Sequence, residues 1–176
     1  MKFNQGDILL FNWNRPKWFS KALKFYNKKK YGQEGWTHAG IIVEVQKDQV
    51  LIYEAVSKGF INSYYNINFL NKVIADKKCI VGKTRIQLID VKLFADQYLG
   101  RPYGILNMLG ILLIFIAGKK ALNIDGSKNL ICSEAVARIL YDASNRQINF
   151  EKEFSIPYDF IEPMHLYKSN QIKWQI

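Results

Sequence analysis

The stretch that decides the fold reads Trp36-Thr37-His38-Ala39-Gly40-Ile41-Ile42-Val43-Glu44-Val45, then four polar residues (46–49), then Val50-Leu51-Ile52-Tyr53-Glu54-Ala55-Val56. Two β-branched, apolar runs separated by a short polar break predict an antiparallel hairpin. Glu54 departs from this pattern, because it shares a strand face with Val50, Ile52 and Val56. A carboxylate on an apolar face is costly to bury without a partner, and His38 on the neighbouring strand is the candidate.

The hairpin sets a geometric condition on this pair. His38 and Glu54 lie on the same face only if residues paired across the turn have numbers with an even sum. A register with an odd sum and no bulge would point the two side chains apart.

The bulk composition indicates one globular domain spanning residues 1–176, with 49% hydrophobic and 23% charged residues. A net charge of +10 favours an anionic partner: a lipid surface, a nucleic acid or an acidic polymer. Cys79 and Cys132 do not make a disulfide framework, and the first residues show no apolar signal region. We therefore expect a reducing, cytoplasmic location, with peripheral membrane contact as an option.

Other segments predict an α+β fold. Short strands are expected over 7–11, 79–85 and 172–176, and a helix capped by Asp90 is expected to end at Gly100 and Pro102. Val91, Phe94, Ala95 and Tyr98 form one face of that helix. The stretch 58–72 is interpreted as a loop with irregular extended pieces, and the region of Pro157 and Pro163 as a loop.

Two segments allow a structural and a lipid-related interpretation. From Arg15 to Lys30 there are seven basic residues and no acid, in a helix predicted to begin with Asn14 as cap and Pro16 in its first turn. Its apolar stripe contains Trp18, Phe19, Ala22, Leu23 and Tyr26. The opposite lysine face is either simply solvated or lies on an anionic membrane. No nucleic-acid motif accompanies the charge, so no specific nucleic-acid partner is expected.

The most apolar segment, Ile105–Ala117, spans 13 residues, fewer than the about 20 that cross a bilayer. It lies in an apolar insert at about 104–124. It is interpreted either as a buried core helix or as a helix that contacts lipid or an acyl chain.

Cys132 stands at the first turn of a predicted helix, on the same side as Ala135, Val136, Ile139 and Leu140. That position lowers a thiol pKa, because the first backbone N–H groups of a helix favour negative charge. His38 is the candidate base, with Glu54 holding its imidazole in one tautomer. The same helix N–H groups can stabilise an oxyanion. Cys79 is expected to be a buried apolar residue and His165 a structural one.

Three short motifs carry a resemblance to a known family. Residues 6–11, 37–43 and 53–55 resemble the strand core of the NlpC-type papain-like hydrolases. Ile131-Cys132-Ser133-Glu134-Ala135 follows these strands instead of preceding them. This order resembles the circularly permuted branch, which includes YiiX/YebB-like bacterial proteins and relatives of lecithin retinol acyltransferase. The similarity extends from Gly6 to about Asp159.

The resemblance implies a permuted papain-like α+β fold, with a small bent antiparallel sheet and helices packed to one side. It implies Cys132 as nucleophile, His38 as general base and Glu54 as the orienting residue. Tyr103 is expected beside the thiol, and Ser133 and Trp36 are expected to contact substrate.

The implied function is a cysteine hydrolase or acyltransferase that acts on an amide or ester bond through a Cys132 thioester, without a cofactor or metal. A lipid and a lipopeptide are both candidate substrates. Two alternatives stay open: a cell-wall peptide amidase or endopeptidase, and a catalytically silent module that binds lipid or a membrane surface. The apolar insert is less typical of enzymes that cleave soluble cell-wall peptides.

Overall fold

The structure is a computed structural model that describes residues 1–12, 17–104 and 129–175, without the side chains of 17–20 and 22. Its centre is a six-stranded antiparallel sheet with the strand order β4-β3-β2-β1-β5-β6. The strands are β1 (Ile8–Phe11), β2 (His38–Val45), β3 (Gln49–Val56), β4 (Gly59–Asn66), β5 (Cys79–Thr84) and β6 (Ile172–Gln175). The predicted α+β class and the strands at 7–11, 36–56, 79–85 and 172–176 are confirmed.

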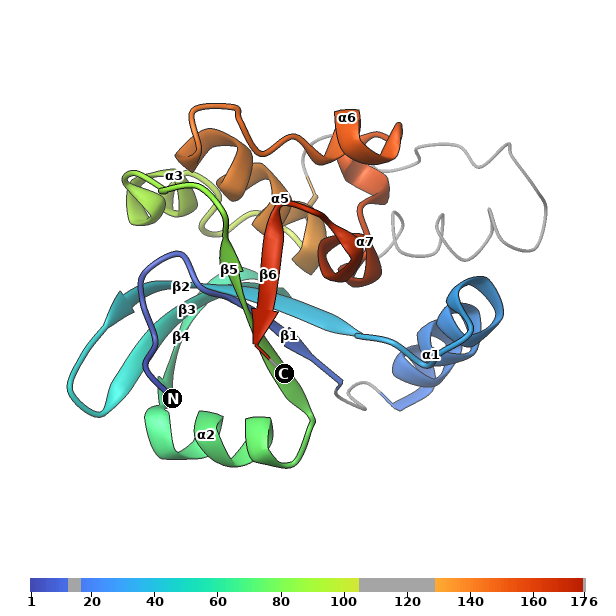
Figure 1. Ribbon diagram of the computed structural model, residues 1–176, viewed down its shortest axis with the longest axis horizontal. Coiled ribbons are helices and arrows are strands. Elements are labelled where there is room, and N and C mark those ends of the chain that lie inside the picture. Colours follow the sequence, from blue (N-terminus) through green and yellow to red (C-terminus); the bar gives the residue numbers. More distant parts are fainter. Residues whose placement is uncertain (13–16, 105–128, 176) are drawn as a thin grey trace.

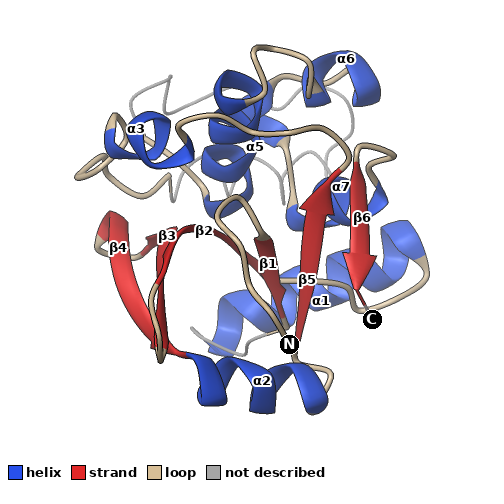
Figure 2. Cartoon of the chain, turned by 60° about the vertical axis from the view of Figure 1, so that its left-hand side comes forward, coloured by secondary structure: helices blue, strands red, loops and turns tan. Residues whose placement is uncertain are grey.

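Helices lie on both faces of the sheet, so the expectation of helices on one side only is wrong. In the described residues they are α1 (Lys17–Tyr31), α2 (Ile67–Ala75), α3 (Val91–Asp96), α5 (Cys132–Ala143), α6 (Phe150–Phe154) and α7 (Pro163–Lys168), with a 3-10 turn at Tyr158–Phe160. Figure 1 shows α3, α5, α6 and α7 on one side, α2 on the other and α1 at the flank. Figure 2 shows how strongly the strands β2–β4 curve.

Successive side chains along each strand point to opposite faces of the sheet, so they contribute in turn to two separate hydrophobic cores. On one face, Ile8, Leu10 and Ile41 pack with the buried side of α5. On the other face, Leu9 and Phe11 pack with Leu70 and Val73 of α2, among others. β1 is buried along its whole length, because it is central and covered on both faces.

The central hairpin has two registers. Gly40 pairs with Glu54 near the open end, which gives an even sum, whereas Glu44 pairs with Leu51 near the turn, which gives an odd sum. A bulge between Ile42 and Glu44 makes the change. The even-sum register therefore holds at the end where His38 lies, as the condition on the pair requires.

The loop predicted over 58–72 is wrong, because this stretch forms β4 and the start of α2. The exposure of β4 alternates from Ile61 onward, the pattern of a strand with one half-buried face. Asn66 ends the strand and caps α2, since its side chain accepts N–H groups from Asn68 and Phe69.

Two further boundaries differ from expectation. Asp90 occupies the N-cap position of α3, but its backbone is left-handed (φ 45°) and its side chain makes no capping hydrogen bond. That helix ends at Asp96, before Gly100. Pro163 does not lie in a loop but opens α7, where its missing N–H costs nothing.

The inner side of α1 packs on the helix that carries Cys132. Leu23 and Tyr26 are buried against Ile131, the residue before Cys132. Asn14, Pro16 and the side chains of Trp18, Phe19 and Ala22 lie outside the described residues, as does the apolar segment 105–117. Within the described ranges, no helix has the length and apolar character needed to cross a membrane.

Candidate active site

His38 is fixed by the strand that it begins. The preceding residue, Thr37, hydrogen-bonds the Phe11 carbonyl through both its amide (2.9 Å) and its hydroxyl (3.3 Å). Phe11 is also the partner of His38 in the β1–β2 register, and the two rings lie 5.9 Å apart. These contacts hold the imidazole at the end of the sheet, where it can reach groups beyond either face.

Glu54 of β3 is the first partner of this imidazole. The His38 Nε2 atom lies 2.6 Å from Glu54 Oε2, and the Glu54 side chain is only 3% exposed. Burial acts to raise the pKa of Glu54, but the hydrogen bond and the charge of His38 outweigh it and lower this pKa. Glu54 is therefore a carboxylate that accepts the Nε2 proton of the ring.

β4 supplies a further contact that was not predicted from the sequence. The Tyr65 hydroxyl donates to Glu54 Oε1 at 2.9 Å, and Ser63 also helps to lower the pKa of Glu54 through a hydrogen bond. Both residues pair with alternate positions of β3, so they share a face with Glu54. Residues 61, 63 and 65 are less exposed than residues 62, 64 and 66, but Ile, Ser and Tyr at these positions form no apolar alternation in the sequence.

Cys132 is the first residue of α5. Ile131 before it has an extended backbone and serves as N-cap, so the sulfur lies beside the N–H groups that a helix leaves unpaired. Burial acts to raise the pKa of the Cys132 thiol. The charge and hydrogen bond of His38, with backbone N–H donors from Ala39 and Ser133, outweigh burial and lower the pKa.

The pair of Cys132 and His38 is consequently poised as thiolate and imidazolium. Burial acts to lower the pKa of His38, but the charges and hydrogen bonds of Cys132 and Glu54 raise it to about 10. Because Nε2 is used by Glu54, Nδ1 is the ring atom left for the sulfur. The Cys132 residue is 5% exposed and the His38 side chain 14%, so water does not screen the pair strongly.

Cys79 has the opposite electrostatic environment. It is fully buried at the start of β5 among the apolar residues of the α2 face, and burial raises the pKa of its thiol to about 12. At neutral pH, Cys79 is therefore protonated, which is the setting of a structural cysteine.

The three residues expected at the substrate site are placed differently. Burial and the neighbouring charge of Cys132 raise the pKa of Tyr103, which indicates that this phenol lies near the sulfur. The Ser133 side chain is fully buried and donates to the Ile161 carbonyl at 2.6 Å, so only its backbone N–H points to the sulfur. Trp36 packs on the main core and its ring lies 6.1 Å from Tyr167.

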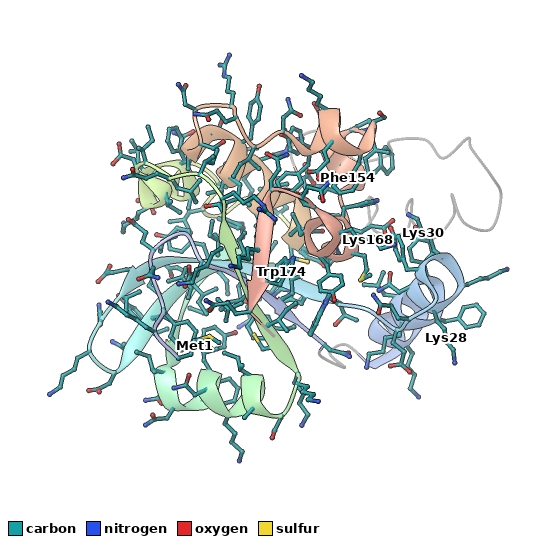
Figure 3. The ribbon with its side chains drawn as sticks, viewed as in Figure 1. Met1, Lys28, Lys30, Phe154, Lys168 and Trp174 are labelled. Atoms are coloured by element: carbon teal, nitrogen blue, oxygen red, sulfur yellow. The ribbon has the colours of Figure 1, made fainter. Side chains whose placement is uncertain are left out.

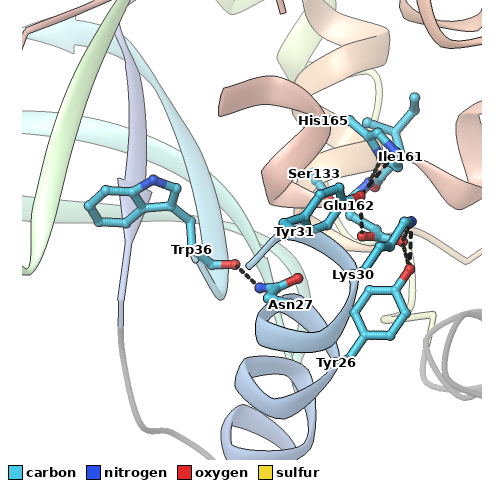
Figure 4. A network of polar contacts seen from close by, with 9 residues as sticks. All are labelled: Tyr26, Asn27, Lys30, Tyr31, Trp36, Ser133, Ile161, Glu162 and His165. Atoms are coloured by element: carbon cyan, nitrogen blue, oxygen red, sulfur yellow. Dashed lines mark hydrogen bonds and ion pairs between the residues drawn. The ribbon is translucent and has the colours of Figure 1, made fainter. Parts of the chain in front are cut away.

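The N-terminal end of α5 is held in place by buried polar contacts. The Glu134 carboxylate accepts the Ile131 N–H at 3.4 Å and the Arg138 side chain at 2.9 Å. Arg138 in turn donates to Asp159 at 2.9 Å. These bonds, with the Ser133–Ile161 bond drawn in Figure 4, fix the helix end that presents the sulfur.

His165, the other histidine, belongs to a different network. Its Nδ1 accepts the Glu162 N–H at 3.0 Å, and its Nε2 lies 3.3 Å from the Tyr31 hydroxyl. Burial lowers the pKa of His165 to about 4, so the ring is neutral. In the described part of the chain, no group of three or more His, Cys, Asp or Glu side chains is arranged to bind a metal ion.

Comparisons with protein-family models, with curated proteins and with solved structures found no match to this chain.

Proposed function

We propose that the protein is a cysteine hydrolase or acyltransferase that cleaves or transfers an acyl group at an amide or ester bond. One observation carries the proposal: a thiol at the mouth of a helix hydrogen-bonds an imidazole, and that imidazole bonds a buried carboxylate at 2.6 Å. The carboxylate stabilises the positive charge of the imidazolium, and the imidazolium stabilises the negative charge of the thiolate.

The first half of the reaction forms a thioester. The Cys132 thiolate attacks the acyl carbon, which makes a sulfur–carbon bond and moves the carbonyl electrons onto oxygen. When the tetrahedral intermediate collapses, the bond to the leaving amine or alcohol breaks. The proton on Nδ1 of the His38 imidazolium passes to that leaving group.

The second half releases the acyl group. Neutral His38 takes a proton from water or from an acceptor amine or alcohol, and the resulting nucleophile attacks the thioester carbon. The sulfur–carbon bond breaks, and the pair returns to thiolate and imidazolium. Glu54 stays ionised throughout, since its role is to orient the ring and to stabilise its positive charge.

The oxyanion of each tetrahedral intermediate needs hydrogen-bond donors beside the sulfur. The first turn of α5 supplies them, because the first N–H groups of a helix have no partner within it and its dipole favours negative charge. The N–H groups of Ala39 and Ser133 already point to the thiolate in the resting state.

The arrangement also supports a permuted papain-like fold as the framework of this site. The imidazole and carboxylate strands, β2 and β3, come first in the chain, and the nucleophile helix α5 follows. α5 lies against the face of the sheet formed by Ala39, Ile41 and Tyr53.

The test uses a thiol-directed acylating probe, such as a p-nitrophenyl ester, with mass spectrometry of the labelled peptide. The wild type and Cys79→Ala should form an acyl-enzyme and release p-nitrophenol in a burst, whereas Cys132→Ala should do neither. Cys79 is a matched control, because both thiols are buried but only Cys132 has an imidazole partner. Equal labelling of the two variants would reject the proposal.

A further inference from the structure

The inner face of α1 is fixed to the body of the protein by a buried carboxylate. Glu162, just before α7, accepts hydrogen bonds from Tyr26 (2.6 Å), Lys30 (3.0 Å) and Tyr31 (3.1 Å). Figure 4 shows these three side chains extending from α1 toward Glu162. Together with the contact of Leu23 and Ile131, they hold α1 in one orientation.

The outer face of α1 consists of Lys21, Phe25, Lys28 and Lys29, all exposed. Phe25 lies among these lysines with 67% of its surface exposed, more than any other large apolar side chain in the described residues. In Figure 3, the labelled Lys30 extends toward α7, whereas Lys28 points away from it. Lys24 at the border has an acidic neighbour, because Glu34 Oε2 lies 3.8 Å from its Nζ atom.

We propose that the outer face of α1 docks on an anionic lipid surface. Lys21 and Lys28 attract negatively charged headgroups, and the phenyl ring of Phe25 between them gains free energy when it enters the boundary between headgroups and acyl chains. The helix has no acidic residue. Because its inner face is occupied by Glu162 and Ile131, the helix can bind in this way without leaving the protein.

The composition of the face favours lipid over nucleic acid. All six basic residues of α1 are lysines. Arginine is the residue that recognises phosphates and bases through paired hydrogen bonds, whereas lysine acts as a point charge. A duplex backbone offers no apolar region for Phe25, whereas a membrane interface does.

The experiment is sedimentation of the full chain with vesicles of phosphatidylcholine, with and without phosphatidylglycerol. Binding should require phosphatidylglycerol and weaken as salt is added. Lys21→Glu/Lys28→Glu should weaken the partition by more than about twentyfold, because each lysine near an anionic surface contributes about fivefold. Phe25→Ala should weaken it by about three- to tenfold.

Matched control variants distinguish the effect of the outer face of α1 from the effects of net charge and of exposed apolar side chains elsewhere. Lys47→Glu/Lys58→Glu makes the same charge change at exposed sites in two β-turns, and Leu93→Ala shortens another exposed apolar side chain, 59% exposed on α3. Both should bind vesicles like the wild type. Cys132→Ala should also bind fully, so a failure of the proposed chemistry leaves this test intact.

Two results would overturn the proposal. One is vesicle binding that falls equally in the α1 variant and in Lys47→Glu/Lys58→Glu, since that would reflect net charge alone. The other is tighter, α1-dependent binding to a single-stranded oligonucleotide, measured by fluorescence anisotropy, together with no binding to phosphatidylglycerol vesicles. Urea unfolding of each variant identifies any loss of binding that comes from loss of fold.

Discussion

The imidazole of His38 and the carboxylate of Glu54 lie 2.6 Å apart, across two strands and 16 residues of chain. The bulge between Ile42 and Glu44 makes this possible, because it changes the register from an odd sum near the turn to an even sum at Gly40 and Glu54. If the register near the turn continued to the end of β2, the two side chains would lie on opposite faces. The bulge is therefore part of the site.

Glu54→Gln should reduce acyl transfer while the protein stays folded. The neutral amide cannot stabilise the imidazolium, so the pKa of His38 falls from about 10 and the pKa of Cys132 rises. The pH range in which thiolate and imidazolium coexist becomes narrower from both sides. We expect kcat/KM for a p-nitrophenyl ester to fall by roughly ten- to a hundredfold at neutral pH.

Glu44→Gln is the control for this change. Glu44 lies on the same hairpin, and its side chain accepts a hydrogen bond from the Gln46 side chain, away from His38 and Cys132. It should keep the activity and the pH profile of the wild type. An unchanged profile in Glu54→Gln would mean that this carboxylate does not set the charge of the imidazole.

Tyr65→Phe should act through Glu54. The change removes the hydroxyl that donates to Oε1 at 2.9 Å but keeps the ring that stacks with Phe11 and Phe69. Without this donor, the pKa of Glu54 rises, so the acid side of the pH profile should move to higher pH. We expect a loss in kcat of about three- to tenfold, close to the net value of one ordinary hydrogen bond, because the hydroxyl acts on the imidazole only through Glu54.

The neighbouring Tyr64 provides a matched control, because it points to the opposite face of β4 and is 57% exposed. Tyr64→Phe should leave both kcat and the acid side of the profile unchanged. If Tyr65→Phe lowered stability but left the pH profile in place, its hydroxyl would have a structural role only.

The strands, and the positions of Glu54 and Cys132 in the candidate site, could be predicted from the sequence. Two β-branched, apolar runs around a polar break identified the hairpin, and an acid on its apolar face identified Glu54. The first-turn position of Cys132 followed from the helical spacing after it. Each of these inferences depends on local periodicity, which side-chain burial imposes directly.

The contacts that complete the site come from β4, which follows β3 directly in the chain but has an unusual composition for a strand. The Asn- and Tyr-rich stretch 59–66 lacks the Val and Ile content of a typical strand, although it pairs with β3 along its whole length. Tyr65 was missed for this reason. The four groups that meet around Glu162 were also missed, because three come from α1 and one from α7, more than 130 residues later.

Alkylation by iodoacetamide should distinguish the two thiols by pH. The thiolate is the reacting species and exists above the thiol pKa, which is lowered at Cys132 and raised to about 12 at Cys79. Cys132 should therefore be alkylated below neutral pH, whereas Cys79 should stay unmodified until the protein unfolds. Peptide mass spectrometry after timed exposure gives both rates.

His38→Ala is the informative variant for this measurement. Loss of the imidazolium leaves burial opposed only by the backbone N–H groups of Ala39 and Ser133, so the pKa of Cys132 should rise. Its alkylation below neutral pH should slow by at least about tenfold. An alkylation rate that did not respond to His38→Ala would show that the imidazole does not activate the thiol.

His165 should make stability depend on pH in a defined direction. Its pKa is lowered from 6.5 to about 4, first by burial and then by the charges of Lys30 and Lys168, which together outweigh the opposing charge of Glu162. The Nδ1 atom of the neutral ring accepts the Glu162 N–H. The unfolded chain takes up this proton first, so the stabilising contribution is complete above pH 6.5 and is lost as pH falls toward 4.

His165→Gln keeps an acceptor for the Glu162 N–H but cannot be protonated. Urea unfolding at both ends of this range should show about 1–2 kcal/mol less pH-dependent loss in His165→Gln than in the wild type, after allowance for partial exposure. Equal losses in the two proteins would place a proton on His165 in the folded state.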